Sequence, residues 1–493
     1  MYKKVVVVGG GTAGWMSAAL LKKLLGLKVD VEVVESDKVK TIGVGEATIP
    51  PIRILNNVLG INEKEFLVET KATLKLAIRF DGWGKMNDSY FHTFGESGFT
   101  SAFANFYSYL RSASDDFDSS QYWQYDANYF CCTKGLVPKD CIGSSNSETP
   151  YAYHFDSTLY GAFLRKHSEK MGVVRTEGFV KEIQVCKQSG VIEQLILENE
   201  KVVSGDLFVD CSGQRGLLIK GALGVEFDDW HEFLPCDRAI AIQTNNPSQD
   251  ILPYTISSAK ANGWTWRIPL QHRVGNGIVY SSAHMSSEDA ITSLMSGLDA
   301  NPITEPNEIS FTTGIVRQPW HKNVVAVGLS CGFLEPLEST SIYLIQSALV
   351  RLIKLFPNLN NMTAVADEFN RQTIKEFELV RDFIVLHYHA NQRGDSDFWK
   401  DLNSMNIPDR LSMKLELFQS SGLLFDDQLD IFREASWMQV LLGQNITPNE
   451  IHPISKMAND ASFKQRLAQI QNKHQLLEQR LVSQRSALEE FLQ

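Results

Sequence analysis

The sequence predicts an α/β fold organised around a buried parallel sheet, and three observations carry this prediction. Val5 to Val8 form a continuous apolar, β-branched run, which is typical of a central parallel strand. A glycine-rich turn, an apolar helix and a second strand ending at Glu35 follow this run in order. From about residue 356 onward the pattern becomes mostly helical. We therefore expect a sheet-based core followed by a helical C-terminal part.

Composition excludes several classes of function. The 493 residues are 43% apolar and 21% charged, as in soluble globular proteins. The formal net charge is −11 and no block of Lys and Arg exceeds three residues, which argues against nucleic acid or an anionic membrane as partner. No apolar run approaches the ~18 residues of a transmembrane helix. Seven cysteines without a Cys-x-x-Cys pair predict a cytoplasmic protein without a metal site.

The glycine turn has the spacing Gly-x-Gly-x-x-Gly, with Gly9, Gly11 and Gly14 at its three positions. Strand, glycine turn, helix, second strand and terminal acid together make the fingerprint of dinucleotide binding. The glycines allow a tight turn and the close approach of a pyrophosphate, and Glu35 would bind ribose hydroxyls. Because Glu35 would repel a 2′-phosphate, NADP is disfavoured. A second glycine-punctuated loop, Thr41 to Pro50, either lies along the cofactor or is an ordinary loop before a helix.

Residues Leu74 to Phe80 alternate in polarity, which predicts one strand with Lys75 and Arg79 on the same face. That face is either a solvated basic surface or the wall of a cavity lined by an inward-facing lysine. Residues 85–150, rich in Ser, Asp, Gly and aromatic side chains, could be an insertion that builds a substrate pocket. His92 within it is either a structural histidine or a pocket residue.

Two later segments also predict buried strands. Leu207 to Gly213 is an apolar run that ends at an acid and a glycine. Gly263 to Pro269 places Trp264 and Trp266 on one face of a strand, two residues apart. Aromatic side chains in such positions usually belong to a core, but two aligned indoles also suit a flat ring system.

A loop between a buried strand (Asn323 to Gly328) and an apolar helix (about Ile342 to Phe356) combines several chemical features. We expect Ser339 or Thr340 to cap the helix by accepting a hydrogen bond from an N–H group one turn later. A helix start also attracts anions, because its first N–H groups lack intrahelical partners and the helix dipole is positive there. Glu338 can act as an acid or base beside such an anion. The alternative is a capping turn with a solvated glutamate.

Taken in chain order, these motifs resemble the flavin-dependent tryptophan halogenase family, from residue 1 to about residue 390. The tandem-indole motif Gly-Trp-x-Trp-x-Ile-Pro is the family's own signature. The resemblance implies an α/β fold with a Rossmann-like FAD-binding domain of the flavin monooxygenase type, an interleaved substrate-binding region and a mostly helical C-terminal part. We expect residues 1–355 to form the FAD-binding core and residues 356–493 to complete the substrate site. The matching segments are Gly9–Trp15, Gly43–Pro50, the strand of Lys75, Tyr90–Gly95, His154–Asp156, Asp210–Gly213, Gly263–Pro269 and Phe333–Thr340.

The resemblance implies that the chain binds FAD, supplied in its reduced form, and a halide ion (chloride, bromide or iodide). Reduced FAD and oxygen would give a flavin hydroperoxide that oxidises halide to hypohalous acid. Thr340 and Ser341, at the helix start, match the halide site. The cofactor-binding positions implied in the same way are Gly9, Gly11, Thr12, Ala13, Gly14, Glu35, Gly45, Ala47, Gly328 and Leu337.

The catalytic residues implied by the resemblance are Lys75 and Glu338. Lys75 would receive hypohalous acid and position it for electrophilic halogenation of the ring. Glu338 would stabilise the cationic ring and remove its proton. The implied substrate-binding positions are His92, Phe94, Trp264, Trp266 and Ser339, and the two tryptophans would also keep the flavin apart from the substrate.

Two departures from the family's pattern bear on specificity. The family usually has glycine after Glu-Ser-Thr, where this chain has Ser341, so the preferred halide is open. Tryptophan halogenases also clamp the amino-acid end of their substrate with a tyrosine-rich segment. The corresponding residues here, Ala435 to Asn445, contain no tyrosine pair. We therefore expect an indole-like or larger aromatic substrate rather than free tryptophan.

One dinucleotide fingerprint is evident in the sequence, so we expect a separate NAD(P)H-dependent flavin reductase as partner. Apolar positions of residues 462–493 recur at helical spacing, and this face could pack on the body of the protein or on another subunit, which would give a homodimer. Two alternatives to a halogenase stay open. One is an aromatic monooxygenase, against which Lys75 and the tandem indoles argue, and the other is an FAD-binding protein without halogenating activity.

Overall fold

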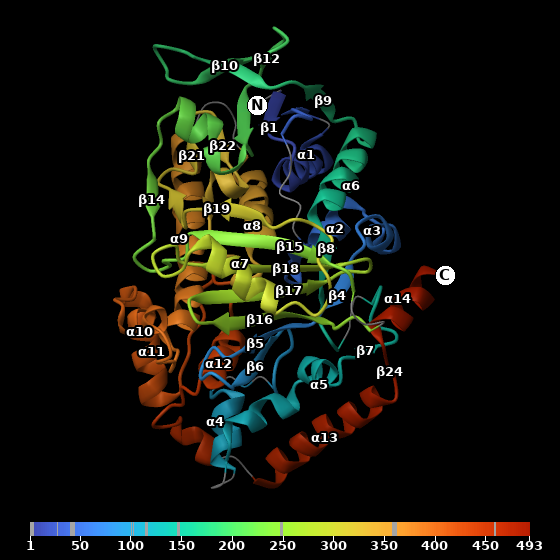
Figure 1. The fold of residues 1–493 in the computed structure, drawn as a ribbon, viewed down its shortest axis with the longest axis vertical. Helices are drawn as coiled ribbons and strands as arrows, with labels where there is room; N and C mark the ends of the chain where they lie inside the picture. Colours follow the sequence, from blue (N-terminus) through green and yellow to red (C-terminus); the bar gives the residue numbers. More distant parts are fainter. Residues whose placement is uncertain are drawn as a thin grey trace. The chain divides into compact units, whose positions relative to one another are not determined.

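The computed structural model describes residues 4–26, 28–39, 45–99, 101, 103–113, 117–144, 148–246, 250–356, 362–457 and 460–493. These residues form two compact units that alternate along the chain, and Figure 1 shows their helices and strands. The first unit consists of Met1–Ala72, Phe155–Pro235 and Ser310–Glu378. The second unit consists of Thr73–His154, Cys236–Ile309 and Leu379–Gln493.

The first unit is built on a six-stranded sheet with the strand order β21-β22-β13-β1-β2-β9. β1 pairs in parallel with β2 and β13, β2 with β9 and β13 with β22, while β21 joins the edge antiparallel. Val5, Val6 and Val7 are fully buried, so the predicted central parallel strand is confirmed. The strands are β1 (Lys4–Val8), β2 (Asp30–Glu35), β9 (Val174–Glu177), β13 (Leu207–Asp210), β21 (Trp320–His321) and β22 (Val324–Ala326).

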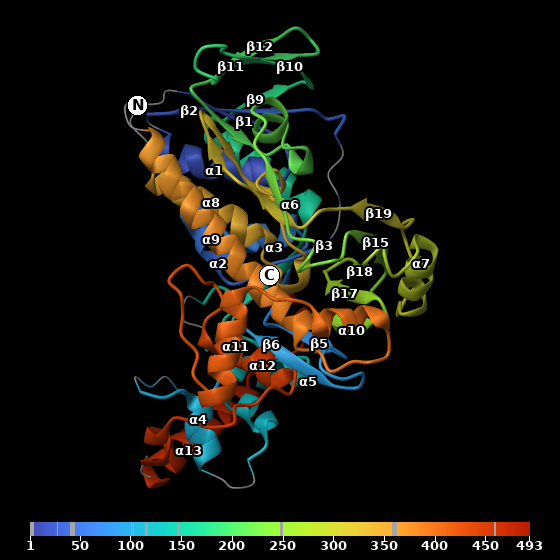
Figure 2. The same cartoon turned by 90° about the vertical axis from the view of Figure 1, so that its left-hand side faces the viewer.

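Helices pack on this sheet, and two small sheets complete the first unit. α1 follows the glycine turn and packs against α6 and α8. Asn62 caps the start of α3, because its side chain accepts a hydrogen bond from the Glu65 N–H group at 3.1 Å. Figure 2 shows β10, β11 and β12 as a separate antiparallel sheet. The elements are α1 (Thr12–Leu25), β3 (Gly45–Ala47), α2 (Pro51–Leu59), α3 (Glu63–Glu69), α6 (Ser157–Lys170), β10 (Val180–Val185), β11 (Ile192–Leu197), β12 (Val202–Ser204), β14 (Phe227–Asp229), β20 (Gly314–Val316), β23 (Gly332–Phe333) and α8 (Ser341–Lys354).

Asp210 organises the chain where β13 ends. Its Oδ1 accepts hydrogen bonds from the N–H group and hydroxyl of Ser212, at 3.0 and 2.6 Å. Its Oδ2 accepts from the N–H groups of Leu218 and Ile219, at 2.8 and 2.9 Å, in the first turn of a π-helix (Leu217–Ala222). The side chain is fully buried, and these four bonds replace the water that it loses. The acid that the sequence places after this strand therefore shapes the backbone.

The second unit is built on a seven-stranded sheet with the order β19-β15-β18-β17-β16-β5-β6, whose strands are labelled in Figure 1. β5 and β16 pair in parallel, whereas β15, β18, β17 and β16 form antiparallel neighbours. β4 pairs antiparallel with β8. The strands are β4 (Thr73–Lys75), β5 (Ala77–Asp81), β6 (Ser89–Thr93), β8 (Ala152–Asp156), β15 (Arg238–Thr244), β16 (Tyr254–Lys260), β17 (Gly263–Pro269), β18 (Val274–Tyr280) and β19 (Asn307–Ser310).

The prediction of one continuous strand from Leu74 to Phe80 is wrong. β4 pairs with β8 and β5 pairs with β16 and β6, so the two halves have different partners. Between them, the Leu76 N–H group donates to the Pro253 carbonyl at 2.7 Å, and its carbonyl accepts from the Phe94 N–H group at 3.0 Å. Because Leu76 is bonded outside both ladders, Lys75 and Arg79 do not share one strand face.

The helices α9 to α14 confirm the helical character predicted for the C-terminal part. One interruption separates α13 from α14, where β24 pairs with β7. In the described residues, no helix combines the length and apolar character that a membrane crossing requires. The elements are α4 (Phe106–Ser112), α5 (Ala127–Lys134), β7 (Val137–Pro138), α7 (Ser287–Ser296), α9 (Met362–His389), α10 (Asp397–Ser404), α11 (Asp409–Ser421), α12 (Glu434–Gly443), α13 (Asp460–Glu478), β24 (Leu481–Val482) and α14 (Gln484–Leu492).

Candidate active site

The glycine turn after β1 has a shape that suits a phosphate group. Gly9 has a φ of 118°, and a Cβ there would lie 2.2 Å from the carbonyl oxygen of Cys211. A Cβ at Gly14 would lie 1.8 Å from the Gly9 carbonyl oxygen, so glycine lets α1 approach β1 closely. A Cβ at Gly11 would meet nothing within 4 Å, which leaves space for a ligand. The three glycines therefore differ in role: tight turn, open approach and close packing.

The start of α1 also suits an anion. Gly11 is the N-cap and offers no capping side chain, Thr12 and Ala13 follow as the first helical residues, and the first turn holds no acidic residue. Exposed N–H groups and the helix dipole favour negative charge at such a position. Gly328, with a φ of 70°, lies against this start, since a Cβ there would lie 2.9 Å from the Ala13 Cβ. The fold thus brings Gly328 to the glycine turn.

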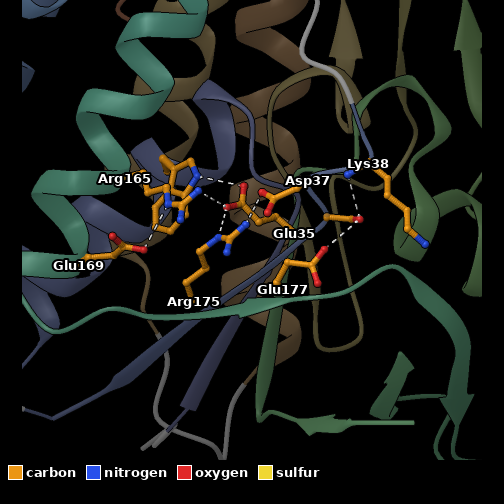
Figure 3. Close-up of polar contacts among 9 residues, drawn as sticks. Glu35, Asp37, Lys38, Arg165, Glu169, Arg175 and Glu177 are labelled. Carbon is orange, nitrogen blue, oxygen red and sulfur yellow. Dashed lines mark hydrogen bonds and ion pairs between the residues drawn. The ribbon is translucent and has the colours of Figure 1, made fainter. Parts of the chain in front are cut away.

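Glu35, at the end of β2, is surrounded by donors (Figure 3). Its Oε1 accepts from Arg175 Nε at 2.5 Å and lies 3.5 Å from an Arg165 nitrogen, and its Oε2 accepts from Trp15 Nε1 at 3.3 Å. Gly10 belongs to this arrangement, because a Cβ there would lie 1.4 Å from Glu35 Oε2. The sequence predicted a role for Glu35 but not for Gly10. Glycine is required at position 10 because the Glu35 carboxylate occupies the space that a side chain there would fill.

The two arginines are themselves paired with further acids. Arg175 lies 2.5 Å from Asp37, and Arg165 Nε lies 3.2 Å from Glu169 (Figure 3). The Glu35 carboxylate is therefore compensated in charge and fixed in position. A carboxylate has about four lone-pair sites, so ribose hydroxyls can donate to it alongside these partners.

The glycine-punctuated loop is described only from residue 45 onward, so Gly43 lies outside the described residues. Gly45 and Ala47 are the buried ends of the short strand β3. Burial raises the pKa of Glu46, between them, to about 7. A carboxyl group that changes charge near neutral pH therefore lies between two residues assigned to cofactor binding by the resemblance.

The loop before α8 does not cap the helix as the sequence predicted. Pro336 begins a 3₁₀ turn (Pro336–Glu338), Ser339 has a φ of 59°, and Thr340 has φ −89° and ψ −9°. No side-chain cap forms at Thr340, because its angles are already helical and not extended, and Ser339 is turned into the left-handed region. That conformation costs a non-glycine residue about 1–2 kcal/mol, a cost that proteins concentrate at functional sites.

The same loop is buried. Glu338 is 1% exposed, and Leu337, Ser339 and Thr340 are 2%, 5% and 1% exposed. The alternative of a solvated glutamate is therefore excluded. Ser341 is half-buried and begins α8, whose first turn contains no acidic residue. A helix start is suited to an anion when it has no side-chain cap and no acidic residue in the first turn of the helix.

A buried network fixes the first turns of α8. Arg351 lies 3.0 Å from Glu376 on α9, with side chains 6% and 3% exposed. The hydroxyls of Tyr343 and Ser347 donate to Glu376 at 2.9 and 2.6 Å. Burial and the Glu376 charge raise the pKa of Tyr343, so its phenol stays a donor. In Figure 2, α8 and α9 run side by side. Tyr343 is two residues beyond Ser341, so this network sets the orientation of the helix start.

In the second unit, Lys75 is fully buried, and its Nζ lies 5.2 Å from the centre of the Phe94 ring. The alternative of a solvated basic strand is therefore wrong for Lys75. Its strand is anchored by a residue that the sequence did not single out. The Leu74 N–H group donates to Gln484 at the start of α14, and Gln484 Nε2 donates to the Ile251 carbonyl at 3.2 Å. No local signal reveals this contact, because Gln484 is remote in sequence.

His92 and Phe94 are held by the residue between them. Thr93 donates its N–H group to Gln439 Oε1 at 2.7 Å, and its hydroxyl donates to the buried Asp126. Burial raises the pKa of Asp126. Gln439 belongs to α12, within Ala435 to Asn445, the segment that the resemblance matches to the family's substrate clamp. That segment therefore contacts the strand that carries His92.

The His92 side chain lies in an aromatic cluster of the second unit. Its ring centre is 5.6 Å from Phe383 and 6.0 Å from Phe432, and those two rings stack at 3.9 Å. Trp437 on α12 packs edge-on against Phe383 at 5.0 Å, and Lys414 Nζ lies 3.8 Å above its ring. The sequence analysis assigned no role to Trp437, although it is the one tryptophan between Ala435 and Asn445.

The tandem indoles lie on β17 as predicted. The ring centres of Trp264 and Trp266 are 6.2 Å apart, and both side chains are buried. Trp266 pairs across the sheet with Gly277 on β18. A Cβ at Gly277 would lie 2.1 Å from the Trp266 ring and 2.6 Å from the Ile240 carbonyl oxygen. The absence of a side chain at Gly277 therefore leaves room for the Trp266 ring.

A family model described as tryptophan halogenase matches residues 4–460. The chain belongs to the tryptophan halogenase family. Tryptophan 6-halogenase SttH of Streptomyces toxytricini is 34% identical over 98% of this chain and 97% of that protein. Tryptophan 7-halogenase RebH of Lentzea aerocolonigenes is 34% identical over 85% of this chain and 82% of that protein.

Solved structures agree. Xcc4156, a flavin-dependent halogenase from Xanthomonas campestris, matches with a TM-score of 0.94 and 41% identity over 99% of this chain and 98% of that chain. BrvH, a flavin-dependent halogenase from Brevundimonas sp. BAL3, matches with a TM-score of 0.92 and 38% identity over 99% of both chains. The protein is therefore an FADH2-dependent halogenase with a Rossmann-like FAD-binding fold. This finding favours a halogenase over an aromatic monooxygenase or a non-halogenating flavoprotein.

Replacing Gly277 by alanine in the halogenase should lower its resistance to thermal unfolding. The added methyl group would press on a rigid indole and a backbone carbonyl, and overpacking of this kind costs about 1–3 kcal/mol. Thermal unfolding followed by circular dichroism measures the effect. Gly297→Ala is the matched control, because a Cβ there meets its nearest atom at 3.7 Å. Equal midpoints for G277A and the wild type would contradict the packing argument.

Proposed function

We propose that the enzyme halogenates an indole-like or larger aromatic substrate, with Lys75 positioning hypohalous acid and Glu338 assisting at the ring. The complete burial of Lys75 beside Phe94 carries this proposal. Burying an ammonium group costs several kcal/mol, so a fold retains one where its charge and N–H donors are used. A buried lysine next to an aromatic ring can hold a small electrophile by hydrogen bond, or as a haloamine, and direct it to a neighbouring ring.

Residues of the first unit fit FAD and halide. The open space at Gly11 and the start of α1 suit the pyrophosphate, and Glu35 suits the ribose. When bound, reduced FAD supplies with oxygen the oxidising equivalents that convert halide to hypohalous acid. Thr340 and Ser341 would bind the halide, since N–H groups at a helix start can replace its hydration shell. The other proposed cofactor positions are Gly9, Thr12, Ala13, Gly14, Gly45, Ala47, Gly328 and Leu337.

Residues of the second unit fit the aromatic substrate. We assign His92 and Phe94 to its ring faces, because flat aromatic side chains favour contact with an electron-rich ring. Trp264 and Trp266 would form the wall between substrate and flavin. From the first unit, Glu338 would stabilise positive charge on the halogenated ring and accept its proton, with Ser339 as its neighbour in the chain.

The C-terminal helical region would complete the substrate site. Phe383 and Phe432 contact His92, and Gln439 fixes Thr93, so residues beyond 356 shape the surroundings of the proposed pocket. Residues 1–355 would form the FAD-binding core in this proposal. Because the sequence contains one evident dinucleotide fingerprint, reduced flavin would come from a separate NAD(P)H-dependent flavin reductase.

A reaction containing the purified enzyme, FAD, NADH, a flavin reductase, oxygen, indole and either chloride or bromide tests the function. We expect a halogenated product by mass spectrometry, and a loss of about a hundredfold or more in the Lys75→Ala variant. Lys85→Ala, at an exposed position of the second unit, is the matched control and should retain activity. Hydroxylated product would contradict the proposal, as would undiminished halogenation by K75A.

Ser341 should influence the choice of halide. Its side chain adds bulk at the helix start, so the bound ion must shed more water, and bromide loses water more readily than chloride. In a reaction containing equal concentrations of both ions, we expect Ser341→Gly to shift the product ratio several-fold toward chloride. The ratio is read from one mass spectrum and does not depend on enzyme concentration. An unchanged ratio would remove Ser341 from the proposed halide site.

Free tryptophan should be a poorer substrate than indole. α12 carries no tyrosine pair, and its Gln439 already bonds to Thr93 and to the Gly95 carbonyl at 3.3 Å. Lys414 lies 3.6 Å from the buried Asp430, so that lysine and acid neutralise each other. With both substrates in one reaction, we expect indole to be preferred by about tenfold or more in kcat/KM. Comparable turnover of the two would contradict this substrate assignment.

A further inference from the structure

His154 is a fully buried histidine on β8, the strand that pairs with β4, and β4 carries Lys75. It pairs with Thr73 of β4, while Ala152 pairs with Lys75. Its Nδ1 lies 3.1 Å from the Thr73 hydroxyl, and its Nε2 lies 2.9 Å from the Thr255 hydroxyl. Both ring nitrogens are therefore engaged.

The hydrogen bonds determine which nitrogen carries the proton. The Thr73 hydroxyl donates to the Pro269 carbonyl at 2.7 Å, and a carbonyl can only accept. With its proton used there, Thr73 can only accept from His154, so Nδ1 is the protonated nitrogen. Nε2 of the neutral ring then accepts the proton of Thr255. The chain of donors runs from Thr255 through His154 and Thr73 to Pro269.

The ring stays neutral in this position. Burial, together with the positive charge of Lys75, holds the pKa of His154 well below its ordinary value. Lys75 is the charged group whose field acts on the imidazole. A charged imidazole would donate from both nitrogens and would break the bond that Thr255 donates. The neutral form is therefore the one that preserves the chain.

The chain of hydrogen bonds joins residues of four strands, β4, β8, β16 and β17. Thr73 and Lys75 are two residues apart, so their side chains leave the same face of β4. Pro269 ends β17, the strand of the tandem indoles, and Thr255 belongs to β16. Thr73 is thus the point at which the lysine strand is attached to the indole strand.

We propose that His154 is a positioning residue for Lys75, acting through Thr73 to hold β4 where the lysine meets the aromatic substrate. This rests on the role of Lys75 in the proposed function. If His154 had only a structural role, replacing it would lower stability and slow every step of the reaction alike. If His154 is a positioning residue, replacing it slows the transfer of halogen to the ring, while the formation of hypohalous acid continues.

The tautomer can be tested without any activity measurement. In the FAD-bound enzyme labelled with ¹⁵N-histidine, the imidazole shifts report the protonated nitrogen, and the His154→Asn variant assigns the signal among 11 histidines. We expect an Nδ1–H ring that does not titrate between about pH 8 and pH 6, where ordinary histidines change charge. An Nε2–H or charged ring in this range would overturn the proposal.

Matched variants test the positioning role. Asparagine at 154 can keep the donor toward Thr73, whereas glutamine keeps a polar group toward Thr255. We expect His154→Gln and Thr73→Val to halogenate indole about ten- to hundredfold less than the wild type, and His154→Asn and Thr73→Ser to retain most activity. FAD affinity and the hypohalous acid captured by a soluble trap, monochlorodimedone, should match the wild type in all four.

The outcomes separate the proposals. Parallel loss of trapped hypohalous acid, FAD affinity and halogenation in T73V and H154Q would indicate a structural role and overturn the positioning role. Equal activity of T73V and T73S would also overturn it. If the wild type itself forms no halogenated product with any aromatic substrate, the proposed function fails, and Lys75 has no step for His154 to serve. The tautomer measurement then stands as a separate result on the hydrogen-bond chain.

Discussion

The burial of the Lys75 ammonium group is the constraint on which the second unit depends. A buried charge costs several kcal/mol, and each unbonded polar group beside it would add to that cost. β4 is only three residues long, and all three residues are buried. His154 and Pro269 hold Thr73, and Gln484 holds the Leu74 backbone. Four segments far apart in the sequence therefore meet to keep one lysine in place.

The first unit meets the opposite requirement, because it keeps backbone N–H groups free of side-chain caps at two helix starts. At α1 the N-cap is Gly11, and at α8 Thr340 makes no side-chain cap. Rigid surroundings hold these uncapped helix starts in place. Gly10 lets Glu35 cross the glycine turn, and Glu376 holds the first turns of α8 through Tyr343. An enzyme that handles a halide needs anion sites with fixed geometry, since a mobile helix start would reorganise at each turnover.

Local patterns in the sequence predicted much of the fold and the identity of many candidate residues. The valine run, the glycine spacing and the acid after β2 each depend on neighbours in the chain, so periodicity revealed them. The caps of α8 and the single strand from Leu74 to Phe80 were predicted wrongly. Before α8, a local 3₁₀ turn closed by the Ser339 N–H group on the Pro336 carbonyl places Ser339 in the left-handed region. At Leu76, a hydrogen bond to Pro253, remote in sequence, ends the strand. Gln439 and Gln484 could not be predicted, because a glutamine carries no sign of a partner hundreds of residues away.

The sequence by itself determined the candidates for the chemistry, namely the residues proposed to bind a dinucleotide, attract an anion, hold an electrophile or face an aromatic ring. These properties belong to residue types and short spacings, and they are retained in any fold that presents the motifs. The tertiary structure alone decided the state of those residues. Lys75 could have been solvated, Glu338 could have been exposed, and His154 could have carried its proton on either nitrogen. Burial and hydrogen-bond partners settle such questions, and both depend on segments that only the folded chain brings together.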